Sequence, residues 1–186
     1  MVLLNKAVFL DRDGTLTRDV PYCSRPEDLH LLPTVAEGLA LLNRFPYKII
    51  LITNQSGIAR GYFDEVALAS IHTKLKDDIC REGGRLDAIY YCPHHPQSRC
   101  HCRKPETGMI ETAARDWDLV LADSYFIGDK YLDIEAANRS GCKAVLVPSE
   151  APETQTLQGD WSYPGRIEFV GRDFLAAVNW LTKEAK

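Results

Sequence analysis

The stretch KAVFLDRDGT, residues 6–15, decides the fold because it joins an apolar run to a group of acidic and small residues. Lys6–Leu10 is short, apolar and bounded by polar residues, which is typical of a buried strand. In open α/β sheets, ligands bind beyond the carboxyl ends of the strands. We therefore expect the polar segment that follows Leu10 to lie at a functional edge of a sheet.

Apolar, strand-like runs alternate with helical patterns along the rest of the chain. Further strands are predicted at residues 48–53, 88–91, 124–127, 143–147 and 168–170. Apolar residues at helical spacing predict helices around residues 35–42, 64–79, 110–117, 133–140 and 174–181. A loop containing Pro, Gly and Gln is predicted over residues 148–165. The alternation predicts the α/β class, with a doubly wound, mainly parallel sheet.

Length and charge narrow the classes of function. The 186 residues fit one domain, 1–186, and the net charge of −4 disfavours a protein that binds nucleic acid through its phosphate backbone. The chain lacks an apolar run of membrane-spanning length, and its N-terminus lacks the features of a signal peptide. We expect a cytoplasmic monomer with a small-molecule substrate, and no nucleic-acid or membrane partner.

Polar residues suited to phosphate chemistry follow four of the predicted strands. DRDGT follows the first strand, TNQSG the second, CRKP the third after a Cys- and His-rich loop, and GDKYLD the fourth. Each residue alone has an ordinary explanation as a helix cap or turn former. Because the carboxyl ends of parallel strands meet at one edge, we expect these groups to converge there.

The nucleophile predicted at this edge is Asp11. A carboxylate is ionised at neutral pH, so it can attack phosphorus without a base and form an aspartyl-phosphate. Carboxylate oxygens also suit Mg²⁺, and Asp129 and Asp133 are the further carboxylates available. Asp13 lies two residues from Asp11, and a neighbouring negative charge raises a carboxyl pKa, which suits a general acid and base.

A hydroxyl and an ammonium group complete the predicted edge. Thr53 offers the hydroxyl and Lys104 the positive charge to the oxygens on phosphorus. Together with the carboxylates, they indicate phosphoryl transfer, in which positioning and charge neutralisation do most of the work.

The four strand-end motifs resemble those of the haloacid dehalogenase superfamily of phosphatases, from Lys6 to about Val147. This resemblance implies a Rossmann-like fold, and the short distances between motifs leave no room for a cap domain. FLDRDGTL, TNQSGIARGYF, IYYCPHHP and CRKPETGM are similar to the D,D-heptose 1,7-bisphosphate 7-phosphatase family. That similarity implies removal of the 7-phosphate of D-glycero-D-manno-heptose 1,7-bisphosphate, giving heptose 1-phosphate for ADP- or GDP-heptose precursors of glycoconjugates such as lipopolysaccharide.

The resemblance also implies roles for individual residues. The catalytic residues would be Asp11, Asp13, Thr53 and Lys104. Magnesium would be held by Asp11, Asp129 and the main-chain carbonyl of Asp13. The substrate would contact Asp19, Val20, Pro21, Tyr22, Asn54, Gln55, Ser56, Arg103 and Lys130. We interpret Asp133 as a helix cap or a partner of these groups.

The Cys/His-rich loop over residues 92–102 carries the pattern C-x-H-x₅-C-x-C. Three cysteines and a histidine form a known structural zinc set, and the loop lacks the C-x-x-C pattern of a redox pair. His94, His95 and His101 are all candidate ligands, and the resemblance selects His94 to join Cys92, Cys100 and Cys102. His101, between two ligand cysteines, is expected to point outward.

Four alternative functions remain at this point. The short spacing between the two halves of the zinc pattern resembles histidinol-phosphate phosphatases of the same branch. A nucleic-acid 3′-phosphatase would also lack a cap domain, but the acidic pI of about 5.7 disfavours it. A receiver-type signalling domain uses a similar Asp, Thr and Lys set, but Asp13 is placed to hydrolyse the intermediate. A zinc-dependent binding module is disfavoured by the complete set of carboxylates.

Overall fold

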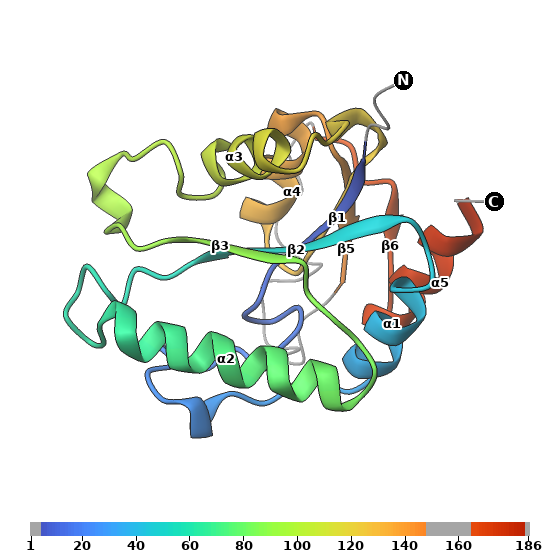
Figure 1. The fold of residues 1–186 in the computed structure, drawn as a ribbon. Coiled ribbons are helices and arrows are strands. Elements are labelled where there is room, and N and C mark those ends of the chain that lie inside the picture. Colours follow the sequence, from blue (N-terminus) through green and yellow to red (C-terminus); the bar gives the residue numbers. More distant parts are fainter. Residues whose placement is uncertain (1–4, 148–164, 185–186) are drawn as a thin grey trace.

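A six-stranded sheet lies at the centre of the computed structural model, which describes residues 5–147 and 165–184 (Figure 1). Its strands are β1 (Lys6–Leu10), β2 (Tyr47–Asn54), β3 (Ala88–Cys92), β4 (Tyr125–Gly128), β5 (Lys143–Leu146) and β6 (Phe169–Val170). All neighbours pair in parallel, in the order β3-β2-β1-β4-β5-β6. From β1 the chain adds β2 and β3 on one side of the sheet and then β4, β5 and β6 on the other, so the strand order reverses between β1 and β4. This confirms the predicted doubly wound α/β fold.

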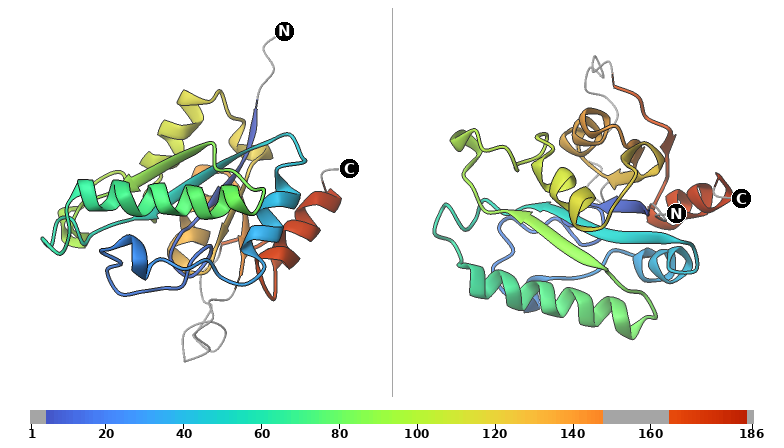
Figure 2. Two further views of the ribbon diagram at one scale, coloured as in Figure 1. Left: turned by 60° about the horizontal axis from the view of Figure 1, so that its bottom comes forward. Right: turned by 45° about the horizontal axis from the view of Figure 1, so that its top comes forward.

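Helices cover both faces of the sheet, as the views in Figure 2 show. One face carries α1 (Val35–Leu42), α2 (Glu65–Arg81) and α5 (Phe174–Glu184), and the other carries α3 (Gly108–Asp116) and α4 (Tyr131–Ser140). Single turns of 3₁₀ helix occur at η1 (Pro26–Asp28), η2 (Pro96–Ser98) and η3 (Leu121–Asp123). This three-layer arrangement leaves the carboxyl ends of the strands for the loops that carry the predicted site.

Two hydrophobic cores lie on opposite faces of the sheet. Val8 and Leu10 join the core under α1, α2 and α5, whereas Phe9 joins the core under α3 and α4. Alternate residues of a strand point to opposite faces, so a strand covered on both sides must be apolar at every position. This explains the uninterrupted apolar runs AVFL (residues 7–10) and IILI (residues 49–52).

The ends of two helices follow their predicted signals. Asp64 caps α2, and its carboxylate accepts a hydrogen bond from the main-chain N–H of Ala67 at 2.8 Å. Gly141 ends α4 with a positive φ of 82°, which glycine adopts without steric cost. The predicted start of α4 at Asp133 was wrong by two residues. The helix begins at Tyr131 because the Asp133 carboxylate accepts a hydrogen bond from the main-chain N–H of Lys130 at 3.1 Å, which caps the first turn.

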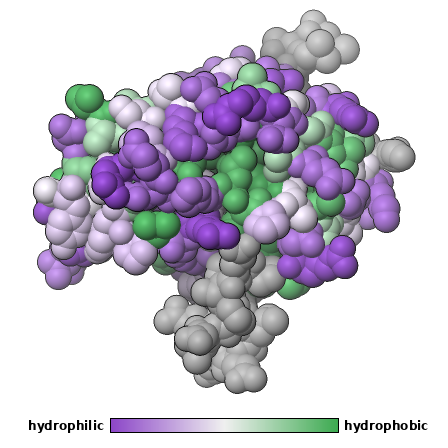
Figure 3. All heavy atoms as spheres, turned by 90° about the horizontal axis from the view of Figure 1, so that it is seen from below, coloured by the Kyte–Doolittle hydropathy of each residue, from purple (hydrophilic) through white to green (hydrophobic). Residues whose placement is uncertain are grey.

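The surface agrees with the charged composition. Figure 3 shows mainly hydrophilic side chains on the face seen from below, around a smaller apolar area. Within residues 5–147 and 165–184, none of the helices has the length and apolar character to cross a bilayer. Apart from Gly165, the loop predicted over residues 148–165 lies outside the described residues.

Candidate active site

The predicted groups converge where the strands β1, β2 and β4 end. Asp11 directly follows β1, and its main-chain N–H donates to the carbonyl of Ile127 in β4 at 3.1 Å. Asp129 directly follows β4, and Thr53 lies at the end of β2. All three side chains are buried. The parallel sheet therefore brings together residues that are far apart in the sequence.

Lys104 lies at the centre of this group. Its Nζ contacts Asp11 Oδ1 at 2.5 Å and Asp133 Oδ1 at 2.7 Å, and donates to the carbonyl oxygen of Ile52 at 2.8 Å. Burial alone would lower the pKa of Lys104, but the two carboxylates outweigh it and raise that pKa. The lysine is therefore a fixed positive charge between two buried carboxylates.

Three carboxylates form a cluster that could hold a cation. Oxygen atoms of Asp11, Asp129 and Asp133 lie within 4.8 Å of one another, and all three residues are buried. Burial, followed by the neighbouring Asp11, raises the pKa of Asp129 to about 8, and burial also raises the pKa of Asp11. Such repulsion is what a divalent cation relieves, and an all-oxygen donor set suits Mg²⁺.

Gly14 allows the turn after β1 to approach Asp129. Its φ of +92° lies in the left-handed region, and a Cβ atom there would lie 2.1 Å from Asp129 Oδ2. The neighbouring Thr15 donates its hydroxyl hydrogen to Asp129 Oδ1 at 3.2 Å. The glycine thus provides the space in which the Asp129 carboxylate sits.

Asp13 faces a different set of partners from the carboxylate cluster. The guanidinium of Arg12 donates to both Asp13 oxygens, from Nε at 2.9 Å and from Nη2 at 3.0 Å. Gln55 Nε2 donates to Asp13 Oδ2 at 3.0 Å and to Thr53 Oγ1 at 2.8 Å. Gln55 therefore links the predicted general acid and base to the predicted phosphoryl contact.

A pocket of about 270 Å³ opens beside these residues. Eight of the nine predicted substrate contacts line it: Asp19, Val20, Pro21, Tyr22, Asn54, Gln55, Ser56 and Lys130. The ninth, Arg103, does not line it. Arg103 instead has a buried Nη1 atom without a hydrogen-bond partner among the described residues. This nitrogen is buried, so the structure does not place it in contact with the pocket.

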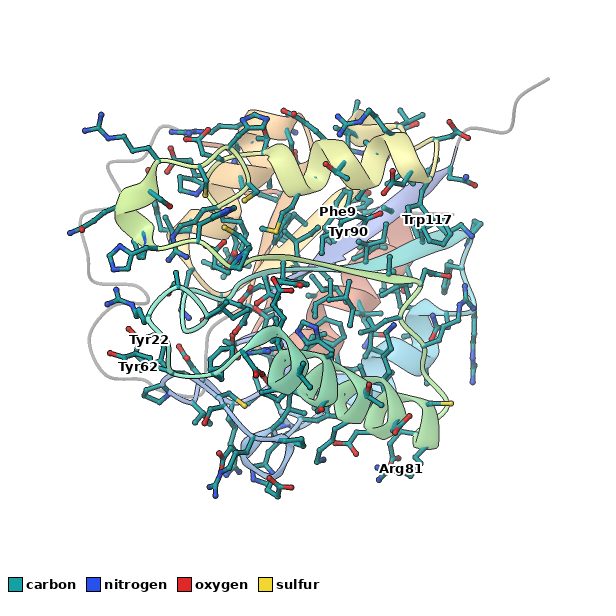
Figure 4. All side chains as sticks on the ribbon, turned by 60° about the vertical axis from the view of Figure 1, so that its left-hand side comes forward. Phe9, Tyr22, Tyr62, Arg81, Tyr90 and Trp117 are labelled. Atoms are coloured by element: carbon teal, nitrogen blue, oxygen red, sulfur yellow. The ribbon has the colours of Figure 1, made fainter. Side chains whose placement is uncertain are left out.

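The rim of the pocket is held by contacts between loops. Lys130 Nζ bonds Asp19 Oδ2 at 2.8 Å and the main-chain carbonyl of Asp13 at 3.3 Å. Figure 4 shows Tyr22 and Tyr62 together at one side of the molecule, and their ring centroids are 4.6 Å apart in an edge-to-face arrangement. These contacts attach the loop of residues 19–22 to the loop after β2 and to the start of α4.

Asn54 has its amide group engaged by the protein itself. Its Nδ2 donates to the carbonyl of Lys104 at 3.2 Å, and its Oδ1 accepts from the main-chain N–H of Lys104 at 3.1 Å. Although Asn54 lines the pocket, its amide fixes the backbone that carries the buried lysine. The sequence motif alone did not reveal this contact, because the two residues are 50 positions apart.

The four side chains predicted as zinc ligands also converge. The Sγ atoms of Cys92, Cys100 and Cys102 lie 3.2–3.6 Å apart, and His94 Nδ1 lies 3.2 Å from Cys102 Sγ. These separations exceed the length of a disulfide, about 2.05 Å, and are close to the edge of a zinc–thiolate tetrahedron, about 3.8 Å. Although burial opposes ionisation, the main-chain N–H of Arg103 and the neighbouring thiols lower the pKa of Cys100 to about 7.

The other two candidate histidines lie outside this cluster. His95 accepts a hydrogen bond from the main-chain N–H of Gln97 at 3.3 Å, at the start of η2. His101 is exposed, and its Nε2 lies 3.0 Å from Glu111 Oε2, so it points outward as expected. The loop thus offers one geometry for a tetrahedral ion, which is compatible with zinc.

Known proteins match this chain along nearly its whole length. The HAD-hydrolase-like family model matches residues 101–177. A D-glycero-D-manno-heptose-1,7-bisphosphate 7-phosphatase from Thermosynechococcus vestitus is 37% identical over 94% of each chain. The D-glycero-beta-D-manno-heptose-1,7-bisphosphate 7-phosphatase of Bordetella bronchiseptica is 36% identical, over 97% of this chain and 99% of its own. The chain belongs to the heptose-1,7-bisphosphate 7-phosphatase family.

A solved structure of this phosphatase family has the same fold. It is the D,D-heptose 1,7-bisphosphate phosphatase from B. bronchiseptica complexed with magnesium and phosphate. It superposes with a TM-score of 0.88 at 36% identity, covering 96% of this chain and 99% of its own. The superposition and the family membership confirm the predicted haloacid dehalogenase fold and the predicted enzyme class, a phosphoric monoester hydrolase.

Sequence reasoning overlooked two buried side chains beside this phosphatase site. Arg12 is 1% exposed, although it lies within the DRDGT motif, and its Nη1 lies 3.4 Å from His72 Nε2. The helical pattern of α2 places His72 one residue after Ile71, on the edge of the buried face. The position of His72 beside the apolar face of α2 was the available signal in the sequence. The sequence does not reveal that Arg12 is the partner of His72.

His72 predicts an acid-sensitive stability for this member of the phosphatase family. Burial, and then the charge of Arg12, lowers the pKa of His72 from 6.5 to about 3. Below pH 6.5 the unfolded chain takes up a proton that folded His72 resists, so its contribution to stability is lost as the pH falls towards 3. When the pH is lowered from about 7 to 4.5, the unfolding free energy of the native protein should fall by about 2 kcal/mol more than that of His72→Gln. Urea unfolding at both pH values tests this, and equal losses in the two proteins would contradict it.

Proposed function

We propose that this enzyme hydrolyses the 7-phosphate of D-glycero-D-manno-heptose 1,7-bisphosphate. The observation that carries the proposal is the buried cluster of Asp11, Lys104 and two further carboxylates next to a pocket lined by the substrate residues expected for the family. The relatives bear the name of this reaction. The proposal includes a single domain over residues 1–186 and a cytoplasmic role in heptose precursor biosynthesis.

In the proposed reaction, Asp11 attacks the phosphorus of the 7-phosphate and the heptose oxygen leaves. Asp13 donates a proton to that oxygen, so the product is a neutral hydroxyl. Asp13 then takes a proton from the water that hydrolyses the aspartyl-phosphate and regenerates Asp11. Lys104 and Thr53 stabilise the phosphoryl oxygens. The three N–H groups of Lys104 are engaged by Asp11, Asp133 and the carbonyl of Ile52, so the lysine would exchange one of these acceptors for a phosphoryl oxygen.

Magnesium fits the oxygen-only donor set at the carboxylate cluster. Asp11, Asp129 and the main-chain carbonyl of Asp13 would hold it, and Asp133 would remain the partner of Lys104. When bound, the ion neutralises charge between the anionic nucleophile and the anionic phosphate. Lys130, which lines the pocket, and Arg103, from the motif of the family, would contact the substrate beyond the phosphate that reacts.

The substrate assignment is tested by comparing two phosphate esters. We expect phosphate release from the heptose bisphosphate to have a kcat/KM at least about 100-fold above that of histidinol phosphate, because the pocket discriminates through polar contacts to hydroxyl groups. Both anomers of the heptose bisphosphate should be included. Faster turnover of histidinol phosphate would reject the heptose assignment and favour the alternative suggested by the short zinc loop.

Zinc removal should disorder the loop that carries Arg103 and Lys104. In Cys100→Ser we expect loss of the bound zinc, a lower Tm and a fall in kcat, because the closed site would lose one of four ligands. Metal analysis and thermal unfolding measure these effects. Cys80→Ser, which changes an exposed cysteine on α2, is the matched control. A native protein that contains no zinc after purification in zinc-supplemented medium would refute the site.

A further inference from the structure

Arg12 is a buried cation in the middle of the DRDGT motif. Its side chain is 1% exposed, and a buried charge is costly unless it is paired and hydrogen-bonded. Its Nε and Nη2 bond the two oxygens of Asp13 at 2.9 and 3.0 Å, which is the bidentate fork geometry of a strong charge-assisted pair. Arg12 lines the pocket together with Asp13, but its guanidinium is directed at the Asp13 carboxylate.

The remaining nitrogen of Arg12 connects it to α2. Arg12 Nη1 lies 3.4 Å from His72 Nε2. Because arginine has only donors, the ring nitrogen that faces it must be the acceptor, so the ring proton sits on Nδ1. His72 is buried and its ring packs edge-on to that of Tyr91, at 6.0 Å between centroids. A neutral histidine on a long helix thus fixes the far side of the guanidinium.

Asp13 therefore has both carboxylate oxygens held before any substrate arrives. Oδ1 accepts from Arg12, and Oδ2 accepts from Arg12 and from Gln55. A carboxylate on a loop would otherwise sample several rotamers, and a proton donor displaced by about 1 Å can lose about 100-fold in rate. The network supplies the support that a proton-transferring group requires.

We propose that Arg12 is a positioning residue that holds the Asp13 carboxylate for proton transfer, and that His72 holds Arg12 in turn. This inference rests on the proposed function, in which Asp13 protonates the departing sugar oxygen. An alkoxide needs that proton, whereas p-nitrophenolate leaves at neutral pH without one. A defect in positioning Asp13 should therefore depend on the leaving group, and a general loss of structure should not.

The first test compares Arg12→Met on the heptose bisphosphate and on p-nitrophenyl phosphate. The constant kcat/KM reports phosphoryl transfer to Asp11, so we expect it to fall about 100-fold for the sugar ester and less than about 5-fold for the aryl ester. KM for the sugar should stay within about twofold, because Arg12, although it lines the pocket, is 1% exposed and has Nε and Nη2 engaged by Asp13. Arg81→Gln removes a cation from the far end of α2, labelled in Figure 4, and should change neither constant.

The second test keeps all charges and alters only His72. Glutamine can accept a hydrogen bond from Arg12, whereas leucine cannot. We expect His72→Leu to show the same dependence on the leaving group, and His72→Gln to recover most of the activity on the sugar ester. The comparison of His72→Leu with His72→Gln also tests the role of Arg12 if Arg12→Met fails to fold.

Two results would overturn the inference. Equal losses on both esters would show a general structural role, and unchanged kinetics in Arg12→Met and His72→Leu would show no role. Failure of the proposed substrate is a separate result: the native enzyme would then release p-nitrophenolate but not phosphate from the heptose bisphosphate. The comparison of leaving groups would then be made with histidinol phosphate.

Discussion

Asp11→Asn is expected to abolish phosphate release, with kcat at least about 10⁴-fold below that of the native enzyme. An amide oxygen is a poor nucleophile towards phosphorus. Among the described residues, Asp11 is the carboxylate that directly follows β1 and contacts Lys104 Nζ at 2.5 Å, so we expect no other carboxylate to replace it. The change is nearly isosteric, and the amide oxygen can still accept from Lys104. We therefore expect the fold to be retained, which circular dichroism and the Tm would check against the native protein.

Asp13→Asn provides the comparison that separates a nucleophile from a supporting carboxylate. It should slow hydrolysis of the intermediate and allow phosphorylated protein to accumulate on p-nitrophenyl phosphate, as seen by intact-protein mass spectrometry. Asp11→Asn should never carry phosphate. Asp77→Asn, an exposed position on α2, controls for the loss of a carboxylate. Turnover by Asp11→Asn above about 1% of the native rate would exclude Asp11 as the nucleophile.

The fold was predictable because local signals and the buried sheet agree. A parallel strand covered on both faces is apolar over nearly its whole length, so runs such as AVFL (residues 7–10) identified the central strands. Asp64 marked the start of α2 through its side-chain cap, and Gly141 marked the end of α4 through its positive φ. The start of α4 was misplaced because Asp133 caps the helix from its third position, which the apolar pattern does not reveal.

The candidate site was predictable only where its residues follow the strands directly. Asp11, Thr53 and Asp129 were placed by topology, because parallel strands end at one edge. Long-range contacts were not accessible in the same way. That Asn54 binds the Lys104 backbone, or that Arg12 meets His72, depends on how loops fold over one another and leaves no periodic signal.

The second large effect is expected from Lys104→Met. This change leaves the buried carboxylates of Asp11 and Asp133 without their shared cation, which bonds them at 2.5 and 2.7 Å. Breaking a buried ion pair by removing one partner costs about 3–5 kcal/mol, and we expect the unfolding free energy of the magnesium-free protein to fall by that amount. Without the positive charge of Lys104 to stabilise the phosphoryl oxygens, kcat/KM should also fall by about 10³-fold.

A second substitution separates the two roles of this lysine. In Lys104→Met with Asp133→Asn, one of the two uncompensated carboxylates is gone, so most of the lost stability should return while activity stays low. The difference between the change in unfolding free energy of the double variant and the sum of the two single changes measures how strongly Lys104 and Asp133 are coupled in the fold. Lys76→Met, at an exposed position on α2, should alter neither property. If Lys104→Met alone kept both its urea midpoint and its kcat/KM, the lysine would be neither the counter-ion of the cluster nor a phosphoryl contact. The buried carboxylates would then have to be neutralised by protons or by metal alone.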